Sequence, residues 1–322
     1  MNNIPLPLMS FLNYMETIQG KSKNTVKEYY YDLRTFFRYL KVQRGLVPKT
    51  AEFEKIRIDD VDIDLIKSVT LNDLYGFISY VSFKRDNSNS AKARKVSTLR
   101  SFFKFLHGKM KMIDENPASE LETPKTPSRH PVYLTLAEAR ELLDSVEGEF
   151  RDRDYCILTL FLNCGLRLSE LVGINISNIR GDTMTVIGKG NKERTVYLND
   201  ACLKAIEDYL RVRPRDGVRD RDALFLSKRK QRISNKTVQH IVKKYVEKAG
   251  LDTDRYSTHK LRHTAATLMY KHGDVDIRAL QQILGHSSIS TTQIYTHVDD
   301  KRLRDAIKKN PLSKAKKDSS DE

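Results

Sequence analysis

Three prolines lie within nine residues, in the segment Thr123-Pro-Lys-Thr-Pro-Ser-Arg-His-Pro131. Proline lacks the backbone donor that a helix needs, and it restricts the residue before it to extended conformations. The segment 123–131 is therefore predicted to be an extended linker that divides the 322-residue chain. We expect one domain over 1–122, a second over 132–310, and a basic, polar tail over 311–322.

The residues before the linker show helical periodicity. Apolar side chains recur on one helix face from 22 to 40, the run 71–83 shows a similar pattern, and a third helix is predicted around 92–106. The third helix carries cations on its other faces, which suits either contact with a phosphate backbone or an ordinary solvated surface. The connection 42–69 contains an alternating stretch at 56–66, which fits either a small helix or a strand.

The second domain is predicted to be mostly helical, with one β-hairpin. Thr135 and Glu138 form a capping-box pattern ahead of its first helix. Two β-prone runs within 183–198 flank the glycine-containing turn 188–192, which predicts the hairpin. Further helices are expected at about 155–163, 200–210, 235–249, 259–272, 276–284, 291–297 and 300–309. The predicted fold class is mainly α: a domain of four to five helices, followed by a mixed domain with a small sheet.

Charge points to a polyanionic partner. The chain has 57 Lys and Arg against 42 Asp and Glu, a net charge of +15, shared as +6 over residues 1–127 and +9 over 128–322. Both parts can therefore attract phosphates, although a generally basic protein would show the same balance. No apolar run is long enough for a membrane span, and the first twenty residues lack a signal-peptide pattern. We expect a cytoplasmic protein whose three cysteines are reduced, buried thiols.

Residue types that handle phosphate gather in the second part of the chain, at the ends of predicted elements. Each has an ordinary structural alternative, such as a salt bridge between Arg167 and Glu170 or a helix-capping role for His286. His259 and His263 stand four apart, but only cations and leucine separate them, so we expect no metal site. The candidate residues are Arg167, Lys189, His259, Arg262, His286 and Tyr295.

Taken together, these residues fit one reaction. Arginines can clamp the non-bridging oxygens of a phosphodiester, and histidines can donate hydrogen bonds or move a proton. A lysine can protonate a leaving alkoxide, and a tyrosine becomes a nucleophile when cations stabilise its phenolate. Such covalent catalysis needs no cofactor and no metal, because the arginines supply the electrostatic stabilisation.

Five segments resemble the tyrosine recombinase (phage integrase-like) family, in the family's order, and most closely its bacterial Xer branch. The similarity is strong over about 130–305 and looser in the helical first part, which resembles the family's SAM-like core-binding domain. The segments are Gly165-Leu-Arg-Leu-Ser-Glu-Leu171, Gly188-Lys-Gly-Asn-Lys-Glu-Arg194, His259-Lys-Leu-Arg-His263, Leu284-Gly-His-Ser287 and Thr291-Thr-Gln-Ile-Tyr-Thr-His297.

The resemblance implies a role for each catalytic candidate. Arg167 and Arg262 would bind the scissile phosphate, and Lys189 would protonate the 5′-hydroxyl leaving group, with Lys192 as a nearby rival. Tyr295 would attack to form a 3′-phosphotyrosyl bond. The remaining two catalytic candidates, His259 and His286, would support the phosphate and assist proton transfer.

Other residues are expected to help without taking part in the chemistry. Glu170 would orient the first arginine. The residues expected to contact DNA outside the scissile phosphate are Lys92, Arg94, Lys95, Lys125, Arg129, Lys192 and Arg194.

The resemblance also implies a partner and an assembly. The expected partner is double-stranded DNA with a specific recombination site, held in a homo-tetramer or in a hetero-tetramer with a related recombinase and processed through a Holliday junction. Chromosome-dimer resolution and mobile-element integration or excision stay open, as do the roles of the 42–69 connection and the tail. The alternatives are type IB topoisomerase-like relaxation, a non-catalytic DNA-binding protein and, more remotely, a metal nuclease.

Overall fold

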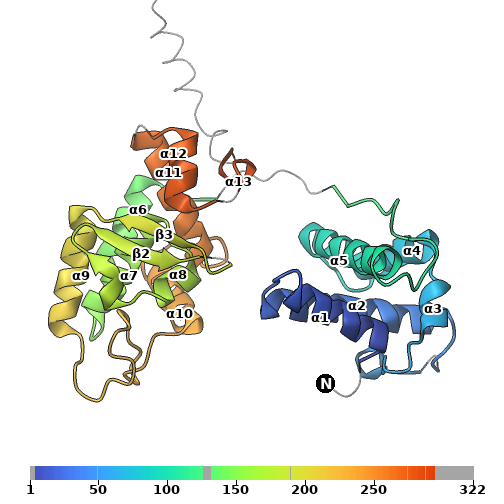
Figure 1. The fold of residues 1–322 in the computed structure, drawn as a ribbon. Helices are drawn as coiled ribbons and strands as arrows, with labels where there is room; N and C mark the ends of the chain where they lie inside the picture. Colours follow the sequence, from blue (N-terminus) through green and yellow to red (C-terminus); the bar gives the residue numbers. More distant parts are fainter. Residues whose placement is uncertain are drawn as a thin grey trace, which may run out of the picture. The chain divides into compact units, whose positions relative to one another are not determined.

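The computed structural model of the chain describes residues 4–48, 50–125, 132–188, 190–273, 275–286 and 288–293. The chain separates into two compact units, 1–128 and 129–322, and the division falls within the segment 123–131 (Figure 1). Four positions named above lie outside the described residues: Arg129, Lys189, Tyr295 and the tail 311–322. The predicted helix at 300–309 and most of the linker lie outside them too. No helix in the described ranges is long and apolar enough to cross a membrane.

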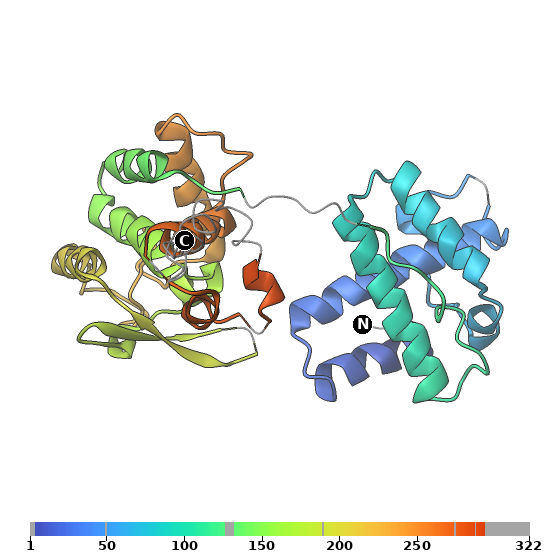
Figure 2. The same ribbon diagram turned by 90° about the horizontal axis from the view of Figure 1, so that it is seen from above.

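The N-terminal unit is built from helices. They are α1 (Leu6–Thr17), α2 (Lys23–Gln43), α3 (Ile63–Lys67), α4 (Leu71–Phe83) and α5 (Asn89–Gly108), with a 3-10 turn at Phe53–Lys55. Figure 2 shows the long α5 crossing α1 and α2, and the three helices pack on one another. Their shared core is rich in fully buried phenylalanines: Phe11, Phe36, Phe37, Phe77, Phe102 and Phe103.

Local signals set the helix starts in this unit. The Ser22 hydroxyl accepts the Thr25 amide at the start of α2, and Thr70 and Asp73 form a capping box at the start of α4. The helix α1 is not among the predicted elements, although Leu8, Phe11, Leu12 and Met15 give it a buried face. The connection 42–69 contains the 3-10 turn Phe53–Lys55 and the short helix α3, and its other described residues after Gln43 form turns and loops, with no strand among them.

Two buried cations of α2 hold that connection. Arg38 donates from Nε to the Ile56 carbonyl at 2.9 Å and pairs with Glu54 at 2.7 Å. Lys41 pairs with Asp60 at 2.6 Å and donates to the Arg57 carbonyl at 3.0 Å. The insert is therefore part of the N-terminal unit's packing.

The C-terminal unit confirms a mainly α fold with a small sheet. Its helices are α6 (Leu136–Asp144), α7 (Arg151–Cys164), α8 (Leu168–Val172), α9 (Asp200–Val212), α10 (Asn235–Lys248), α11 (Thr258–His272), α12 (Ile277–Leu284) and α13 (Ser290–Gln293), with a 3-10 turn at Ile176–Asn178. The strands β1 (Ile179–Arg180), β2 (Thr183–Ile187) and β3 (Glu193–Tyr197) form an antiparallel sheet in chain order. Thr183 faces Tyr197 and Ile187 faces Glu193, so the predicted hairpin is present.

Helix α7 is the centre of this unit. It is buried along most of its length and packs against α9 and α11 (Figure 1). Cys156, Cys164 and Cys202 are all buried and unbridged, as predicted from their number and spacing. The helix ends at Gly165, whose left-handed backbone turns the chain toward Arg167 two residues later. The packing of α7 in the core therefore fixes the position of Arg167, the first catalytic candidate along the chain.

Candidate active site

A buried carboxylate organises the site. Arg167 is the residue before α8, and Glu170 occupies the third position of that helix. The Glu170 side chain is fully buried, and its carboxylate accepts the Arg167 backbone N–H at 2.8 Å and Arg167 Nη1 at 2.7 Å. Burial alone would raise the pKa of Glu170, but the hydrogen bond and charge of Arg194, followed by the backbone and side-chain hydrogen bonds of Arg167, lower it below its usual value. The predicted contact between Glu170 and Arg167 is therefore present, with Glu170 ionised.

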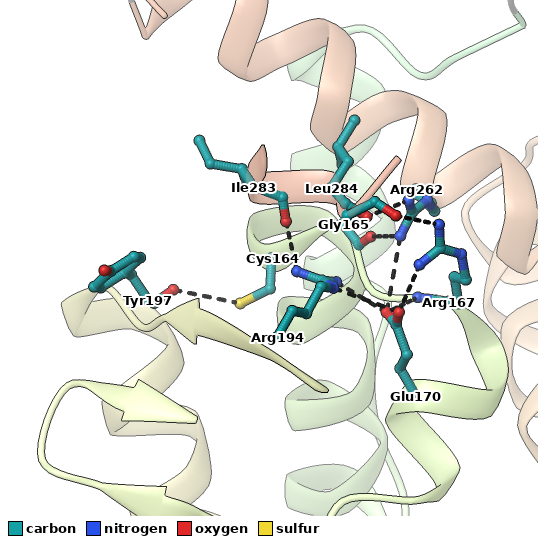
Figure 3. Close-up of polar contacts among 10 residues, drawn as sticks. Cys164, Gly165, Arg167, Glu170, Arg194, Tyr197, Arg262, Ile283 and Leu284 are labelled. Atoms are coloured by element: carbon teal, nitrogen blue, oxygen red, sulfur yellow. Dashed lines mark hydrogen bonds and ion pairs between the residues drawn. The ribbon is translucent and has the colours of Figure 1, made fainter. Parts of the chain in front are cut away.

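Three arginines from three different elements meet this carboxylate (Figure 3). Besides Arg167, Arg194 of β3 donates from Nη2 to Glu170 at 2.9 Å, and Arg262 of α11 lies 3.8 Å from it. One carboxylate among three guanidinium groups gives this set of four side chains a net charge of +2. A cluster of this kind favours an incoming anion, because the surrounding protein screens its charge less than water does.

The same three arginines also hold the end of α12. Arg194 Nη1 donates to the Ile283 carbonyl, Arg262 Nη2 to the Leu284 carbonyl at 2.7 Å, and Arg167 Nη2 to the Gly285 carbonyl at 2.8 Å. The last carbonyls of a helix accept no hydrogen bond within that helix. The three arginines supply the donors that these carbonyls would otherwise lack. Three consecutive carbonyls thus each receive a different arginine.

Two glycines let these parts approach one another. Gly165 has φ +58°, and a Cβ placed there would lie 2.8 Å from Leu284 Cδ2. Gly285 has φ +62°, and its Cβ would lie 2.6 Å from Arg194 Cδ. Both conformations are ones that L side chains rarely adopt, and both positions lack room for a methyl group. The close contact of α7, α12 and β3 therefore depends on glycine at each position.

Three histidines lie around the arginines. His259 and His263 of α11 meet edge to face, with ring centroids 4.5 Å apart. His286, just after α12, has Nδ1 2.9 Å from the Thr292 hydroxyl, which is fully buried in α13. His286 therefore links the end of α12 to α13, and the two other rings contact each other on α11.

All three imidazoles are shifted toward the neutral form. Burial lowers the pKa of His286 to about 4, helped by the positive charges of Arg262 and Arg167. Burial followed by His259 lowers the pKa of His263 to about 4. Burial, Lys260 and Arg262 lower the pKa of His259. In the DNA-free protein at neutral pH these imidazoles are therefore uncharged, and an anion beside the arginines would favour their protonation.

The described neighbours of the two remaining catalytic candidates are close to this cluster. Gly188, which precedes Lys189, donates to the Lys192 carbonyl at 2.8 Å, and a Cβ on Gly188 would lie 3.3 Å from Glu170 Oε1. On the other side, α13 ends at Gln293, two residues before Tyr295. Gly188 therefore lies beside Glu170, and Thr292 of α13 lies beside His286.

The residues predicted to contact DNA fall into two groups. On α5, Lys95 is 7% exposed and pairs with buried Asp32 at 2.6 Å, so it does not lie on the solvated face predicted for it. Arg94 pairs with the same carboxylate at 2.6 Å, and Lys92 donates to the Ser82 hydroxyl at 3.1 Å. The second group is exposed. Lys125 and Lys192 both have exposed side chains.

Arg194 is the site residue whose surroundings the sequence interpretation missed. It was expected to contact DNA, yet its side chain is 12% exposed and bonded to Glu170 and the Ile283 carbonyl. The strand pattern carries a signal for this, because Arg194 and buried Val196 are two residues apart and share a face of β3. In the part of the chain that the structure describes, no group of His, Cys, Asp and Glu has the arrangement of a metal site.

Comparison with known proteins gives this geometry its context. The model of the phage integrase family matches residues 132–302. The tyrosine recombinase XerC of Caldanaerobacter subterraneus subsp. tengcongensis is 61% identical over 309 residues, covering 96% of this chain and 88% of that protein. The tyrosine recombinase XerD of Proteus mirabilis is 37% identical, covering 91% of this chain and 89% of that protein.

The fold has solved counterparts as well. A crystal structure of XerH site-specific recombinase bound to a palindromic difH substrate, a post-cleavage complex, matches with a TM-score of 0.69 at 21% identity, covering 94% of each chain. The family match spans more than half of the chain, and the relatives match nearly all of it. This chain therefore belongs to the phage integrase family and is a tyrosine recombinase of the Xer branch.

Proposed function

We propose that this site-specific recombinase cleaves DNA at a phosphate held by Arg167 and Arg262, with Tyr295 as the nucleophile. The cluster of three arginines around one buried carboxylate supports the phosphate site, because these four side chains together carry a net charge of +2, which attracts an anion. Planar guanidinium groups can bind two phosphate oxygens at once, and they stabilise the charge that grows on those oxygens during attack.

The bond changes follow from the residue types. The Tyr295 oxygen attacks phosphorus, a 3′-phosphotyrosyl bond forms, and the bond to the 5′ oxygen breaks. Lys189 gives its proton to that leaving oxygen, and His259 and His286 support the phosphate and assist proton transfer. The phosphotyrosyl bond conserves the phosphodiester, so the 5′-hydroxyl of a partner strand can rejoin the DNA without an energy source.

The test of the nucleophile is covalent capture. A duplex nicked close to the cleavage point loses a short fragment after attack and traps the protein–DNA bond, which a denaturing gel detects. Tyr295→Phe should abolish this adduct, while Tyr197→Phe, which alters a 73% exposed tyrosine of β3, should leave it intact. An adduct that survives in Tyr295→Phe would exclude Tyr295 as the nucleophile.

The assembly is proposed as four protomers on two duplexes, with exchange through a Holliday junction. The two basic parts of the chain, +6 and +9, would hold the duplex from both sides, with Lys125 and Arg129 of the linker region beside phosphates. Incubating this protein alone with two labelled sites tests the homo-tetramer. A junction that forms only after a related recombinase is added would instead establish the hetero-tetramer.

We propose that the protein acts on the bacterial nucleoid, at one specific DNA site. Sequencing the DNA that Tyr295→Phe protein retains in its host would identify that site. A site near the replication terminus would indicate resolution of chromosome dimers, and the ends of a mobile element would indicate integration or excision. Relaxation of any supercoiled plasmid without junction intermediates would instead favour a topoisomerase.

A further inference from the structure

Arg194 stands out among the three arginines because it comes from the sheet. It lies on β3, one strand of the hairpin whose turn holds Lys189, whereas Arg167 begins α8 and Arg262 lies on α11. Its guanidinium spans two partners, the Glu170 carboxylate at 2.9 Å and the Ile283 carbonyl at the end of α12. One side chain thus connects the hairpin, the buried carboxylate and the segment that leads to His286.

The surroundings of Arg194 leave it little access to DNA. Its side chain is 12% exposed, between the 31% of Arg167 and the 4% of Arg262, and all three of its guanidinium nitrogens donate to protein acceptors: Nε and Nη2 to Glu170 and Nη1 to the Ile283 carbonyl. Its Cδ fills the space beside Gly285 that a Cβ would need. Protein groups therefore hold the Arg194 side chain on several sides, as expected of a residue that positions other side chains.

We propose that Arg194 is a positioning residue for the two phosphate-binding arginines and does not itself contact the DNA. It shares Glu170 with Arg167 and Arg262, so it fixes where that carboxylate lies between them. It also holds the first of three consecutive carbonyls, of which Leu284 and Gly285 are bonded to the other two arginines. This inference rests on the proposed function, since it assigns Arg194 a part in aligning that same phosphate site.

Loss of Arg194 should affect alignment more than DNA binding. Glu170 would keep Arg167 as its partner, but the Ile283 carbonyl would lose its donor and α12 would lose one of its three attachments. DNA affinity is spread over many phosphate contacts, so removing a residue that makes none should change it little. Cleavage depends on geometry much more steeply, because small displacements of catalytic groups lower rates strongly.

The first experiment separates binding from chemistry. Arg194→Gln and Arg194→Lys proteins are compared with the parent for duplex affinity and for the single-turnover rate of adduct formation on the nicked duplex. We expect affinity within about threefold of the parent, and a rate about 100-fold lower for both variants. Lysine should not rescue, because an ammonium group cannot replace the planar fork between Glu170 and Ile283. A parent-like rate in Arg194→Lys would overturn the proposal.

The matched control is Arg211→Gln. Arg211 lies on α9, is 62% exposed along its side chain and pairs with Glu207 of the same helix. This variant should keep both the affinity and the rate of the parent. If Arg194→Gln does not fold, as judged by its circular dichroism melt, Arg194→Lys is carried through the same measurements.

The second experiment distinguishes alignment from general support of the fold. In a nicked duplex with a methylphosphonate at the cleavage point, a methyl group replaces one non-bridging oxygen and the phosphate is neutral. If Arg194 acts by aligning the charges that neutralise that phosphate, the rate difference between parent and Arg194→Gln should shrink to about threefold on this substrate. An equal difference on both substrates would overturn the proposal. Failure of the proposed function looks different, since the parent would then form no Tyr295 adduct on either substrate, and this inference would fall with it.

Discussion

At the scale of single residues, the site depends on a few side chains whose identity the sequence reveals and whose contacts it does not. Arg167, Arg262 and Glu170 are recognisable from their motifs, and the contact of Glu170 with Arg167 follows from their spacing of three. That Arg194 shares the same carboxylate depends on β3 lying beside α8, a tertiary contact with no local signature. Lys95 was misjudged for a similar reason, because its partner Asp32 lies on another helix.

The tight turn at Gly165 provides a stability test. Gly165→Ala puts a Cβ at φ +58°, 2.8 Å from Leu284 Cδ2. The left-handed conformation alone should lower the free energy of unfolding by about 1–2 kcal/mol, and the clash with Leu284 adds to it. Urea denaturation followed by circular dichroism measures the change. Gly181→Ala, which has φ +57° and open space around it, is the control and should show only the smaller, conformational loss.

The buried histidines make stability depend on pH. The pKa values of His263 and His286 are lowered to about 4 by burial and by the nearby positive charges, while an unfolded histidine titrates at about 6.5. Between these values the unfolded chain binds more protons than the folded one, so stability is full above about pH 6.5 and falls as the pH drops toward about 4. Denaturation curves across this range should show that loss.

Replacing one of these imidazoles identifies the source of the slope. His263→Gln should show a smaller decline of unfolding free energy between about pH 6.5 and about pH 4 than the parent does. His240→Gln changes an exposed side chain of α10 and should leave the parent's slope unchanged. Identical slopes in parent and His263→Gln would show that this histidine is not shifted.

At the scale of elements, the sequence predicts helices well where periodicity and caps agree. The helix at 71–83 coincides with α4 and the hairpin lies within 183–198, because apolar periodicity marks the first and a glycine-containing turn marks the second. The helix α1 has few charged residues to contrast with its apolar face. The connection 42–69 alternates like a strand yet forms loops, a 3-10 turn and the short helix α3. Its conformation is decided by attachment to α2 rather than by local propensity.

That attachment can be tested at Arg38. Arg38→Met removes the donor to the buried Ile56 carbonyl and the partner of Glu54. An unsatisfied buried carbonyl should lower the unfolding free energy of the N-terminal unit by about 2 kcal/mol. Hydrogen exchange read by mass spectrometry would locate the loss at 53–67. Arg57→Met changes a 70% exposed side chain that pairs only with Asp59 nearby, and it should have no such effect.

At the scale of the whole molecule, charge and family membership describe the protein together. A net charge of +15 spread over both units indicates a polyanionic partner, and the motifs distinguish the cations proposed to act on one phosphate from those proposed to hold the duplex. How the two units close on DNA is not encoded in any local pattern of the sequence. The target sequence is equally absent, since it is read by scattered contacts to base edges.

Holding the duplex by many phosphate contacts should make binding steeply dependent on salt. Because each neutralised phosphate releases counterions, affinity for a labelled duplex should fall about 100-fold or more between about 50 and 200 mM salt. Lys192→Gln should reduce the slope of log affinity against log salt by about one, since its side chain is exposed. Arg211→Gln, ion-paired within α9, should leave the slope unchanged. Fluorescence anisotropy measures both, and salt-independent affinity would contradict a two-sided clamp.

The three carbonyls at the end of α12 have a thermodynamic consequence. Arg262 and Arg167, which would bind the phosphate, already donate to the carbonyls of Leu284 and Gly285. The position of this helix end and the affinity for phosphate are therefore thermodynamically linked. Any neighbouring protomer that shifts the α12–α13 segment must change phosphate affinity by some factor. By reciprocity, the phosphate must change the affinity for that neighbour by the same factor. In the proposed tetramer, a single turn of backbone would thereby make one protomer's affinity for DNA depend on the next protomer.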